Sequence, residues 1–487
     1  MPSAYTSFVL FFLLLVFGLA NAPVFYDPDT AWHLASGDAI RLSHAVPRHD
    51  SWSFTAGTDN WYNLSWLFDL GLAQLFHYGS FSAVYAITIL IFALSLTLMA
   101  RHAVRRGASP IIVLLLLLPI APNIYTSILA RPNLCSILLT VIFYLILHDY
   151  SRNGRFCRLL LLPGLMAFWV NLHGGFLLAF PLIGCFLAGA VLERNRTHST
   201  AYTAILALCL LATLINPYGF AVYYGAYRTV AAAFSHVLME WKPVEIGHNL
   251  PMTLVLLLML CIGDFSDRKI PFADRALAVF ILLLALSSLR HCAVAALLLM
   301  PYLALRATSL AYGSRIGKRI RNIDTAIMAD MGKTDIRMLA LAMVLAAGAL
   351  IALPWPRDAI LAEPAGFRKA HFPVKEAAFI ADYYPGLRFL NSYNIGGYLD
   401  YIWQGKVKVF VDGRANSLYS DDVLNDYKAF TENHGFGGRA EMIAAQYRLD
   451  GLIIANDDED AGLWRWNPDW KVVYSGDAAT VYLHKSY

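Results

Sequence analysis

Long apolar blocks separated by short polar segments run through the first 355 residues of the chain. Blocks such as Ile111–Leu118 and Leu254–Cys261 contain no charged residue. A helix needs about 20 apolar residues to cross a bilayer, so repeated blocks of this kind predict repeated crossings rather than one large soluble core. We predict a polytopic α-helical membrane protein with about eleven transmembrane helices. They cover roughly residues 5–22, 82–100, 109–123, 132–149, 159–172, 175–192, 203–217, 251–264, 276–290, 291–306 and 338–355.

Clusters of arginine and lysine follow every second predicted helix. Cytoplasmic loops of membrane proteins are enriched in these residues, so the clusters predict a cytoplasmic N-terminus. With an odd number of crossings, the tail after Trp355 lies outside, together with the loop at residues 23–80 and the segment 218–250. The clusters are Arg101–Arg106, Arg152–Arg158, Arg194–Arg196, Arg268–Arg275 and Arg306–Arg337.

The N-terminal apolar stretch has two interpretations. It ends in Ala20-Asn21-Ala22, which resembles a signal-peptidase site. Met1–Ser7 carries no lysine or arginine, however, and a signal peptide normally begins with basic residues. We therefore favour a retained first helix over a cleaved signal. Either alternative places the loop at residues 23–80 outside.

The last part of the chain has the pattern of a small α/β domain. Amphipathic stretches alternate with short apolar runs, and Ser475-Gly476-Asp477 separates the final two runs, which predicts a hairpin. The sequence therefore predicts a membrane domain at residues 1–355 and an extracytoplasmic α/β domain at residues 356–487. The predicted helices are Lys375–Tyr384, Asp421–Phe430 and Arg439–Tyr447, and the predicted strands are Val407–Val411, Leu452–Ala455, Trp470–Tyr474 and Ala479–His484.

The composition agrees with a membrane protein. The chain is 58% hydrophobic and 15% charged, with a mean hydropathy of +0.52, whereas soluble domains are about 45–50% apolar and about 25% charged. The net charge is +4, and the basic residues sit in short loops, so they indicate orientation rather than nucleic-acid binding. The 6 cysteines lie in or beside apolar segments without a C-x-x-C pair. This pattern argues against a disulfide framework or a metal cluster.

Two carboxylates, Asp27 and Asp29, stand near the start of the loop at residues 23–80, beside aromatic residues. A carboxylate next to a membrane and aromatic rings can act as a general base. The alternative is structural, because Asp29 stands where a helix that starts at Thr30 would be capped. The pair of aspartates alone does not decide between these two roles.

The residues that follow Asp29 resemble, in kind and order, the first outer loop of the GT-C superfamily of polytopic membrane glycosyltransferases. In that superfamily an acidic residue is followed by a short helix, a segment with glycine and proline, and a surface helix that leads to the next span. Residues 64–78 are predicted to be that surface helix. The matching positions are Asp29, Ala35, Gly37, Pro47, Gly57 and Trp66-Leu67.

The chain departs from many GT-C members in one respect. They begin the loop with paired Asp-Glu, whereas this chain has Asp27-Pro28-Asp29, which leaves open which aspartate acts. The chain looks more like a little-characterised bacterial branch of such proteins. The pieces that carry this likeness are Arg131-Pro132, Asn171-Leu172-His173-Gly174-Gly175, Asn216-Pro217-Tyr218-Gly219, Gly396-Gly397-Tyr398 and Asp412-Gly413-Arg414.

The resemblance implies a lipid-linked sugar donor, a polyprenyl phosphate that carries one hexose or pentose. Asp29 or Asp27 would deprotonate a hydroxyl of a glycan, lipid or protein acceptor, and the oxygen would attack the anomeric carbon with inversion. The lipid phosphate would leave. The reaction would take place on the outer face of a bacterial cytoplasmic membrane. The sequence leaves open whether a divalent cation takes part.

Cationic groups near the outer surface would stabilise the leaving phosphate. Arg131, Arg290 and His291 lie in predicted outer loops, against the general charge trend, and the alternative is that they extend to lipid headgroups. His173 is alternatively a turn residue, and Glu240 an interfacial ion-pair partner. The predicted substrate-binding residues are Arg131, Arg290, His291, His173, Glu240, Trp32 and His33.

A second hypothesis is a non-catalytic membrane protein, such as a transporter or an assembly factor for an envelope polymer. Ion-coupled transporters carry ionisable residues inside their transmembrane helices. The predicted helices here are nearly free of charge except at their ends. This distribution argues against ion-coupled transport, whereas the sequence does not exclude an assembly factor.

Overall fold

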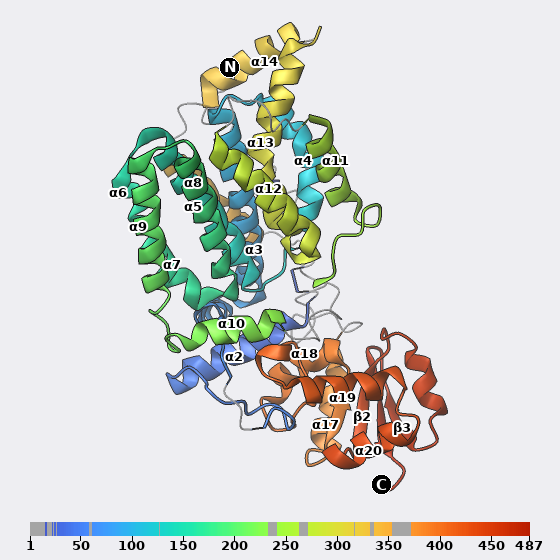
Figure 1. The fold of residues 1–487 in the computed structure, drawn as a ribbon. Helices are drawn as coiled ribbons and strands as arrows, with labels where there is room; N and C mark the ends of the chain where they lie inside the picture. The colour runs from blue at the N-terminus through green and yellow to red at the C-terminus, as the bar shows by residue number, and fades with distance from the viewer. Residues whose placement is uncertain are drawn as a thin grey trace.

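A bundle of apolar helices carries an α/β unit at one end (Figure 1). The computed structural model describes residues 15–16, 22, 24–25, 27–57, 61–125, 127–231, 241–262, 271–315, 317–331, 336–352 and 372–487. The bundle helices are α3 (Trp66–Arg105), α4 (Pro110–Tyr125), α5 (Asn133–Asn153), α6 (Phe156–Leu159), α7 (Leu161–Leu172), η1 (Gly174–Leu178), α8 (Ala179–Leu192), α9 (Arg196–Ala212), α11 (Leu250–Ile262), α12 (Phe272–Ser287), η4 (Leu289–His291), α13 (Cys292–Gly313) and α15 (Ile336–Ala352).

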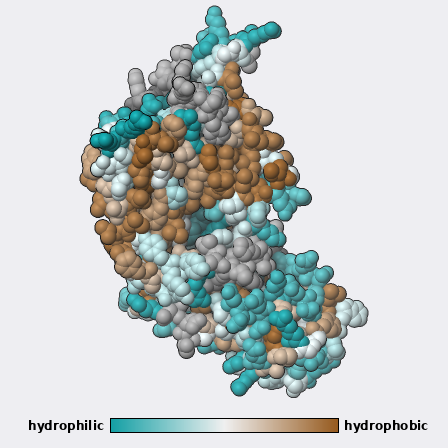
Figure 2. Space-filling view, in the orientation of Figure 1, coloured by the Kyte–Doolittle hydropathy of each residue, from teal (hydrophilic) through white to brown (hydrophobic). Residues whose placement is uncertain are grey.

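The bundle has the surface of a membrane domain. Within the described residues, 4 helical segments are long and apolar enough to cross a bilayer, and shorter apolar helices such as α4 and α11 stand beside them. Figure 2 shows a broad hydrophobic surface over the helices and a hydrophilic surface over much of the α/β unit. The chain is thus a multi-pass membrane protein. The predicted count of about eleven spans is not confirmed, and the first predicted span lies almost wholly outside the described residues.

Helix α3 combines two elements that the sequence separates. Its backbone leaves helical geometry at Ser80, where φ is 55° and ψ is −168°. The stretch before this kink contains the predicted surface helix, and the apolar stretch after it contains the second predicted span. A positive φ is uncommon for a non-glycine residue, and at Ser80 it separates two helical stretches.

Helices α2 (Asp29–Ser43), α10 (Ala221–Ala231) and α14 (Gly317–Met331), which are less apolar than the bundle helices, lie at the two ends of the bundle. Helices α2 and α10 lie next to the α/β unit, while the amphipathic helix α14 lies at the opposite end (Figure 1). Lys318, Arg319 and Arg321 belong to α14. The start of the first loop and the α/β unit therefore share one end of the bundle, and the last basic cluster lies at the other.

The α/β unit contains a sheet of 4 strands in the order β1-β2-β4-β3, in which β1 and β2 are parallel and the other pairs are antiparallel. Strands β3 and β4 form the predicted hairpin. The elements are α17 (Val374–Tyr383), β1 (Phe389–Asn391), α18 (Tyr393–Trp403), η5 (Ala415–Ser417), α19 (Asp421–Glu432), α20 (Gly438–Tyr447), β2 (Gly451–Ala455), η6 (Ala461–Trp466), β3 (Trp470–Ser475) and β4 (Ala479–His484).

One predicted strand of this unit is wrong. The apolar residues of Val407–Val411 are buried but lie outside the sheet, and Val409 forms an isolated bridge with Ser53 of the first loop. The apolar run is buried against that loop instead of against neighbouring strands, so its periodicity alone could not distinguish the two arrangements.

A glycine pair allows helix α18, which the sequence analysis missed, to pack closely. A Cβ atom at Gly396 would overlap the carbonyl oxygen of Val411, and one at Gly397 would lie 2.8 Å from the carbonyl oxygen of Pro28. Gly397 therefore lets α18 pack against the start of α2, and Gly396 lets it pack against the segment at Val411 and Asp412. An aromatic cluster that includes Trp32, Trp52 and Trp61 extends this contact into the core of the α/β unit.

Candidate functional site

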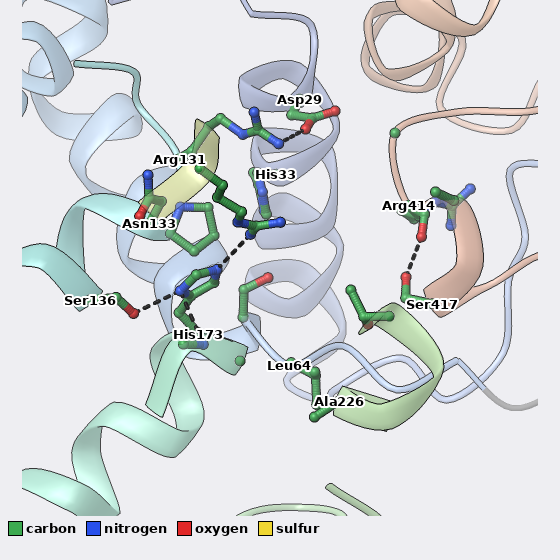
Figure 3. A pocket seen from close by; sticks show the side chains of 18 of the residues that line it. Asp29, His33, Leu64, Arg131, Asn133, Ser136, His173, Ala226, Arg414 and Ser417 are labelled. Atoms are coloured by element: carbon green, nitrogen blue, oxygen red, sulfur yellow. Dashed lines mark hydrogen bonds and ion pairs between the residues drawn. The ribbon is translucent and has the colours of Figure 1, made fainter. Parts of the chain in front are cut away.

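A cavity of about 390 Å³ lies where the bundle, the first loop and the α/β unit meet. In Figure 3, Asp29, Arg131, His33 and His173 line one side of this space, and Arg414 and Ser417 stand across from them. The cavity also receives residues from α10 and from the segment between α12 and α13. It is therefore built from segments that are far apart in the sequence.

Arg131 bridges the two aspartates of the first loop. Its Nη1 lies 2.8 Å from Asp27 Oδ2, and its Nη2 contacts Asp29 Oδ2. Helix α2 begins at Asp29 itself, and Asp27 Oδ1 accepts a hydrogen bond of 2.7 Å from the Asp29 backbone N–H. The helix starts one residue earlier than the capping alternative assumed, with Pro28 at the N-cap position, and the Asp29 carboxylate contacts Arg131.

A second cationic group approaches from the loop between α12 and α13. Arg290 Nη2 lies 3.3 Å from His173 Nε2, and the Arg290 guanidinium lies 5.0 Å from the centre of the Trp241 ring. His173 Nδ1 accepts a hydrogen bond from Gly175 N–H and lies 2.7 Å from Ser136 Oγ. Burial lowers the pKa of His173 well below its usual value, and the charges of Arg290 and Arg131 lower it further, so this imidazole is neutral.

Trp32 and His33 line the cavity from helix α2. Their rings lie 3.6 Å apart between centres. His33 Nδ1 lies 2.6 Å from Asp69 Oδ1, and both side chains are buried. The indole Nε1 of Trp32 is buried and makes no hydrogen bond within the described chain. The first loop thus places two different groups at the cavity, namely the hydrogen-bonded His33 ring and the Trp32 N–H donor.

The α/β unit closes the far side with the segment Gly413–Ser417. A Cβ atom at Gly413 would overlap Asp29 Oδ1, so this glycine allows the segment to rest against the aspartate. Arg414, the next residue, is fully buried and lies between Trp52 and Trp61, with its guanidinium 4.9 and 5.0 Å from their ring centres. The α/β unit therefore contributes to the wall of the cavity.

Arg414 is held by carboxylates from both sides of this junction. It lies 2.6 Å from Asp50 of the first loop and 2.6 Å from Asp412, with Asp400 at 3.8 Å. Burial alone would raise the pKa of Asp50, but Arg414 and hydrogen bonds from Ser53 lower it below its usual value. Burial and the neighbouring Asp412 raise the pKa of Asp400 well above its usual value. Asp400 is therefore neutral, whereas Asp50 is an ionised partner of Arg414.

The predicted site residues converge, with two qualifications. Asp27 stands behind Asp29 and contacts Arg131 without lining the cavity, and Glu240 lies outside the described residues. His291 lines the cavity, and its buried Nδ1 makes no hydrogen bond within the described part of the chain. The predicted residues that line the cavity are Asp29, Trp32, His33, Arg131, His173, Arg290 and His291.

Sequence reasoning missed Asp69, Asn63 and the role of Arg414. Asp69 is noticeable as the one carboxylate within the otherwise apolar surface helix at residues 64–78. Its partner His33 lies 36 residues earlier, so no local pattern connects them. Arg414 belongs to the noted Asp412-Gly413-Arg414 piece, but its partner Asp50 is 364 residues away.

The described residues contain no group of three or more histidines, cysteines or carboxylates placed to hold a metal ion. At the start of α2 the guanidinium of Arg131 already lies against both Asp27 and Asp29.

Comparison with solved structures defines the fold. Oligosaccharyltransferase AglB from Archaeoglobus fulgidus, solved in complex with an inhibitory peptide and a dolichol-phosphate, is similar with a TM-score of 0.61 and 11% identity. The match covers 93% of this chain and 69% of that one. ArnT from Cupriavidus metallidurans in the apo state is similar with a TM-score of 0.50 and 12% identity, over 99% of this chain and 98% of that one. The chain therefore has the fold of the GT-C superfamily, as its loop residues predicted. No protein-family model and no curated protein matches it in sequence.

Proposed function

We propose that this protein is a glycosyltransferase that moves a sugar from a polyprenyl-phosphate donor to an acceptor on the outer face of a bacterial cytoplasmic membrane. The observation that carries the proposal is the convergence of Asp29, Arg131, His173 and Arg290 on one cavity, at the end of the bundle that carries the α/β unit. These residues come from four segments that share no local structure. Their convergence in a GT-C fold is what a common substrate site requires.

Arg131 and Arg290 are suited to the phosphate of the donor. Both lie beside the cavity on the bundle side, and guanidinium groups bind phosphate oxygens with paired N–H donors. In the reaction, the acceptor oxygen bonds to the anomeric carbon from the face opposite the phosphate, and the bond between that carbon and the phosphate oxygen breaks. Negative charge then gathers on the departing polyprenyl phosphate. Fixed cations at this place stabilise the transition state more than the substrate.

The molecules bound to AglB support the proposed class of ligand. That protein was solved with a dolichol-phosphate, which is itself a polyprenyl-type phosphate, and with a peptide. The present chain shares its fold and places cationic groups in a cavity next to its apolar bundle.

The charges at the two ends of the bundle support one orientation of the protein in the membrane. The end with α14 carries Lys318, Arg319 and Arg321, and the end with the cavity carries the α/β unit. Basic residues are retained on the cytoplasmic side. We therefore place the cavity and residues 372–487 on the outer side, where lipid-linked sugars would meet an extracytoplasmic acceptor.

The test is sugar transfer by purified protein with polyprenyl phosphates that carry a radiolabelled hexose or pentose and an envelope extract as acceptor pool. Arg131→Gln is expected to lower turnover by about 10²–10³-fold, the usual effect of removing one preorganised charge-stabilising group. Asp29→Asn and Asp27→Asn test the predicted bases in the same assay. Asp38→Asn is the matched control, because Asp38 also pairs with an arginine of the first loop, Arg41 at 3.0 Å, but away from the cavity.

A wild-type protein that transfers no label from any of these donors would contradict the proposal. Unchanged turnover in Asp29→Asn, Asp27→Asn and the double variant would remove the aspartates as bases without removing the transferase. The alternative of an assembly factor predicts no label transfer, together with envelope defects that Arg131→Gln leaves unaltered.

A further inference from the structure

The imidazole of His33 is fixed in one tautomer by its surroundings. Its Nδ1 lies 2.6 Å from Asp69 Oδ1, and Asp69 is fully buried. With the carboxylate as the acceptor of this contact, Nδ1 is the donor and carries the proton. We assign the tautomer from this contact. Nε2 then carries the lone pair and is the nitrogen that can take up a proton.

Asp69 is itself held in place. Asn63 Nδ2 donates to Asp69 Oδ2 at 2.8 Å and lies 2.9 Å from Ser36 Oγ. Helices α2 and α3 pack closely here, because a Cβ atom at Gly37 would overlap the backbone oxygen of Asp69. Both carboxylate oxygens of Asp69 thus have a donor. The carboxylate is therefore oriented before any substrate arrives.

The ring of His33 faces the proposed reaction space. The Trp32 ring lies against it in a tilted arrangement at 3.6 Å between ring centres, and Phe68 meets the ring edge-on at 5.6 Å. His33 lines the cavity together with Asp29 and Arg131 (Figure 3). Since Asp69 occupies Nδ1, the ring edge left for the cavity is the one with Cε1 and Nε2. Trp32, Phe68 and Asp69 thus hold the ring in place, which leaves Nε2 as the nitrogen available to the cavity.

Asp29 is less suited to take a proton. Its carboxylate contacts the guanidinium of Arg131, which stabilises the ionised form over the protonated one. An Asp–His pair has the opposite property, because the carboxylate stabilises the imidazolium that forms when the ring accepts a proton. The carboxylate of Asp29 is therefore placed to hold an arginine, and that of Asp69 is placed to support a histidine base.

We propose that His33 is the general base of the transferase and that Asp69 is its positioning residue. This inference rests on the proposed function. The acceptor O–H proton moves to His33 Nε2 while the oxygen bonds to the anomeric carbon and the polyprenyl phosphate leaves with the electrons of the broken bond. Asp29 and Asp27 hold Arg131 at the phosphate. The charged and titratable groups that face His33 are Asp69 from α3, Arg131 from the loop before α5, and His173 from the loop after α7.

The experiment measures sugar transfer from polyprenyl phosphates carrying radiolabelled hexose or pentose by full-length protein in detergent, as a function of pH. His33→Asn keeps a side-chain donor for Asp69 but removes Nε2, and His33→Ala leaves room for added imidazole. We expect turnover to fall by about 10²–10⁴-fold in both, the usual range for a general base. Imidazole should restore turnover in His33→Ala and not in Asp29→Asn.

Asp69→Asn tests the positioning role. An amide at this site must turn its NH₂ either to His33 or to Asn63, and both neighbours are donors in the native arrangement. With the NH₂ turned to His33, the ring proton moves to Nε2 and the base is lost, so we expect turnover to fall while KM changes little. His77→Gln, on the same helix α3 but exposed, is the control, and unfolding temperatures establish that each variant is folded.

The outcomes separate the two proposals. Wild-type transfer with an acidic limb in the pH profile, lost in His33→Asn and regained with imidazole in His33→Ala, supports His33 as base. Wild-type turnover in folded His33→Asn overturns it, as does an acidic limb that disappears in Asp29→Asn and persists in His33→Asn. No transfer by the wild type overturns the proposed function and this inference with it.

Discussion

Two arginines of this protein stand in the same chemical setting at different depths. Arg131 lies between Asp27 and Asp29, and its side chain is 21% exposed beside the cavity. Arg414 lies between Asp50 and Asp412, and its side chain is 0% exposed. The first arginine joins the helical bundle to the first loop, and the second joins that loop to the α/β unit.

The difference in depth separates an exchangeable contact from a fixed one. A guanidinium at the edge of a cavity can give up one carboxylate for a phosphate, because water and substrate reach it. A buried guanidinium cannot, since each partner left behind would be an unpaired charge in a low-dielectric interior. We therefore propose that Arg131 binds substrate and that Arg414 attaches the α/β unit.

The largest expected effect comes from removing the buried arginine. Arg414→Met leaves Asp50 and Asp412 buried without a cation, which should lower the free energy of unfolding by about 3–5 kcal/mol. The measurement is thermal unfolding in detergent, together with protease cleavage of the α/β unit. Arg41→Met, which removes the half-buried pair with Asp38, should change stability by about 1 kcal/mol or less.

Arg131→Met completes this comparison. It should reduce turnover while costing clearly less stability than Arg414→Met, because solvent reaches its partners. Equal losses of stability in the two variants would break the distinction between them.

The next largest effect is expected at the glycine that lies between the two arginine sites. Gly413→Ala places a methyl group on Asp29 Oδ1, so either the aspartate or the segment Gly413–Ser417 must shift. We expect turnover to fall by at least about tenfold, since misplacement by an ångström can cost more than that. Stability should change less, because Asp50 and Asp412 keep Arg414.

Gly462→Ala is the matched control for this substitution, because a Cβ atom there would meet no atom within 4 Å. Both variants are assayed for sugar transfer and thermal unfolding. Full activity of Gly413→Ala would show that the α/β unit does not shape the cavity at Asp29.

The smallest effect concerns Asp400, the neutral member of the buried cluster. Burial and Asp412 raise its pKa in the folded state, so above the pKa of the unfolded chain the folded state binds more protons. Stability then falls as pH rises from about 4, the ordinary value for aspartate, towards the folded pKa. Asp400→Asn imitates the neutral acid and should remove this loss.

Unfolding temperatures from pH 4 to pH 8 measure the prediction for Asp400. The unfolding temperature of Asp400→Asn should rise relative to that of the wild type as pH increases. A constant difference between the two proteins would indicate that Asp400 is ionised in the fold.

The sequence revealed much of the fold, because apolar blocks and strand runs are local properties of the chain. The helices α17, α19 and α20 and the hairpin β3–β4 are confirmed close to their predicted bounds. Helix α18 was missed, because Gly396 and Gly397 mark close packing that only the partner segments reveal.

The sequence by itself determined that the chain is a membrane protein and which polar residues of its loops to examine. Hydrophobicity and charge are written residue by residue, and so Asp29, Arg131, His173 and Arg290 could be named in advance. Only the tertiary structure decided which of them meet. The pairs Arg131–Asp29, His33–Asp69 and Arg414–Asp50 are separated by 102, 36 and 364 residues, and no local pattern encodes contacts at such distances along the chain.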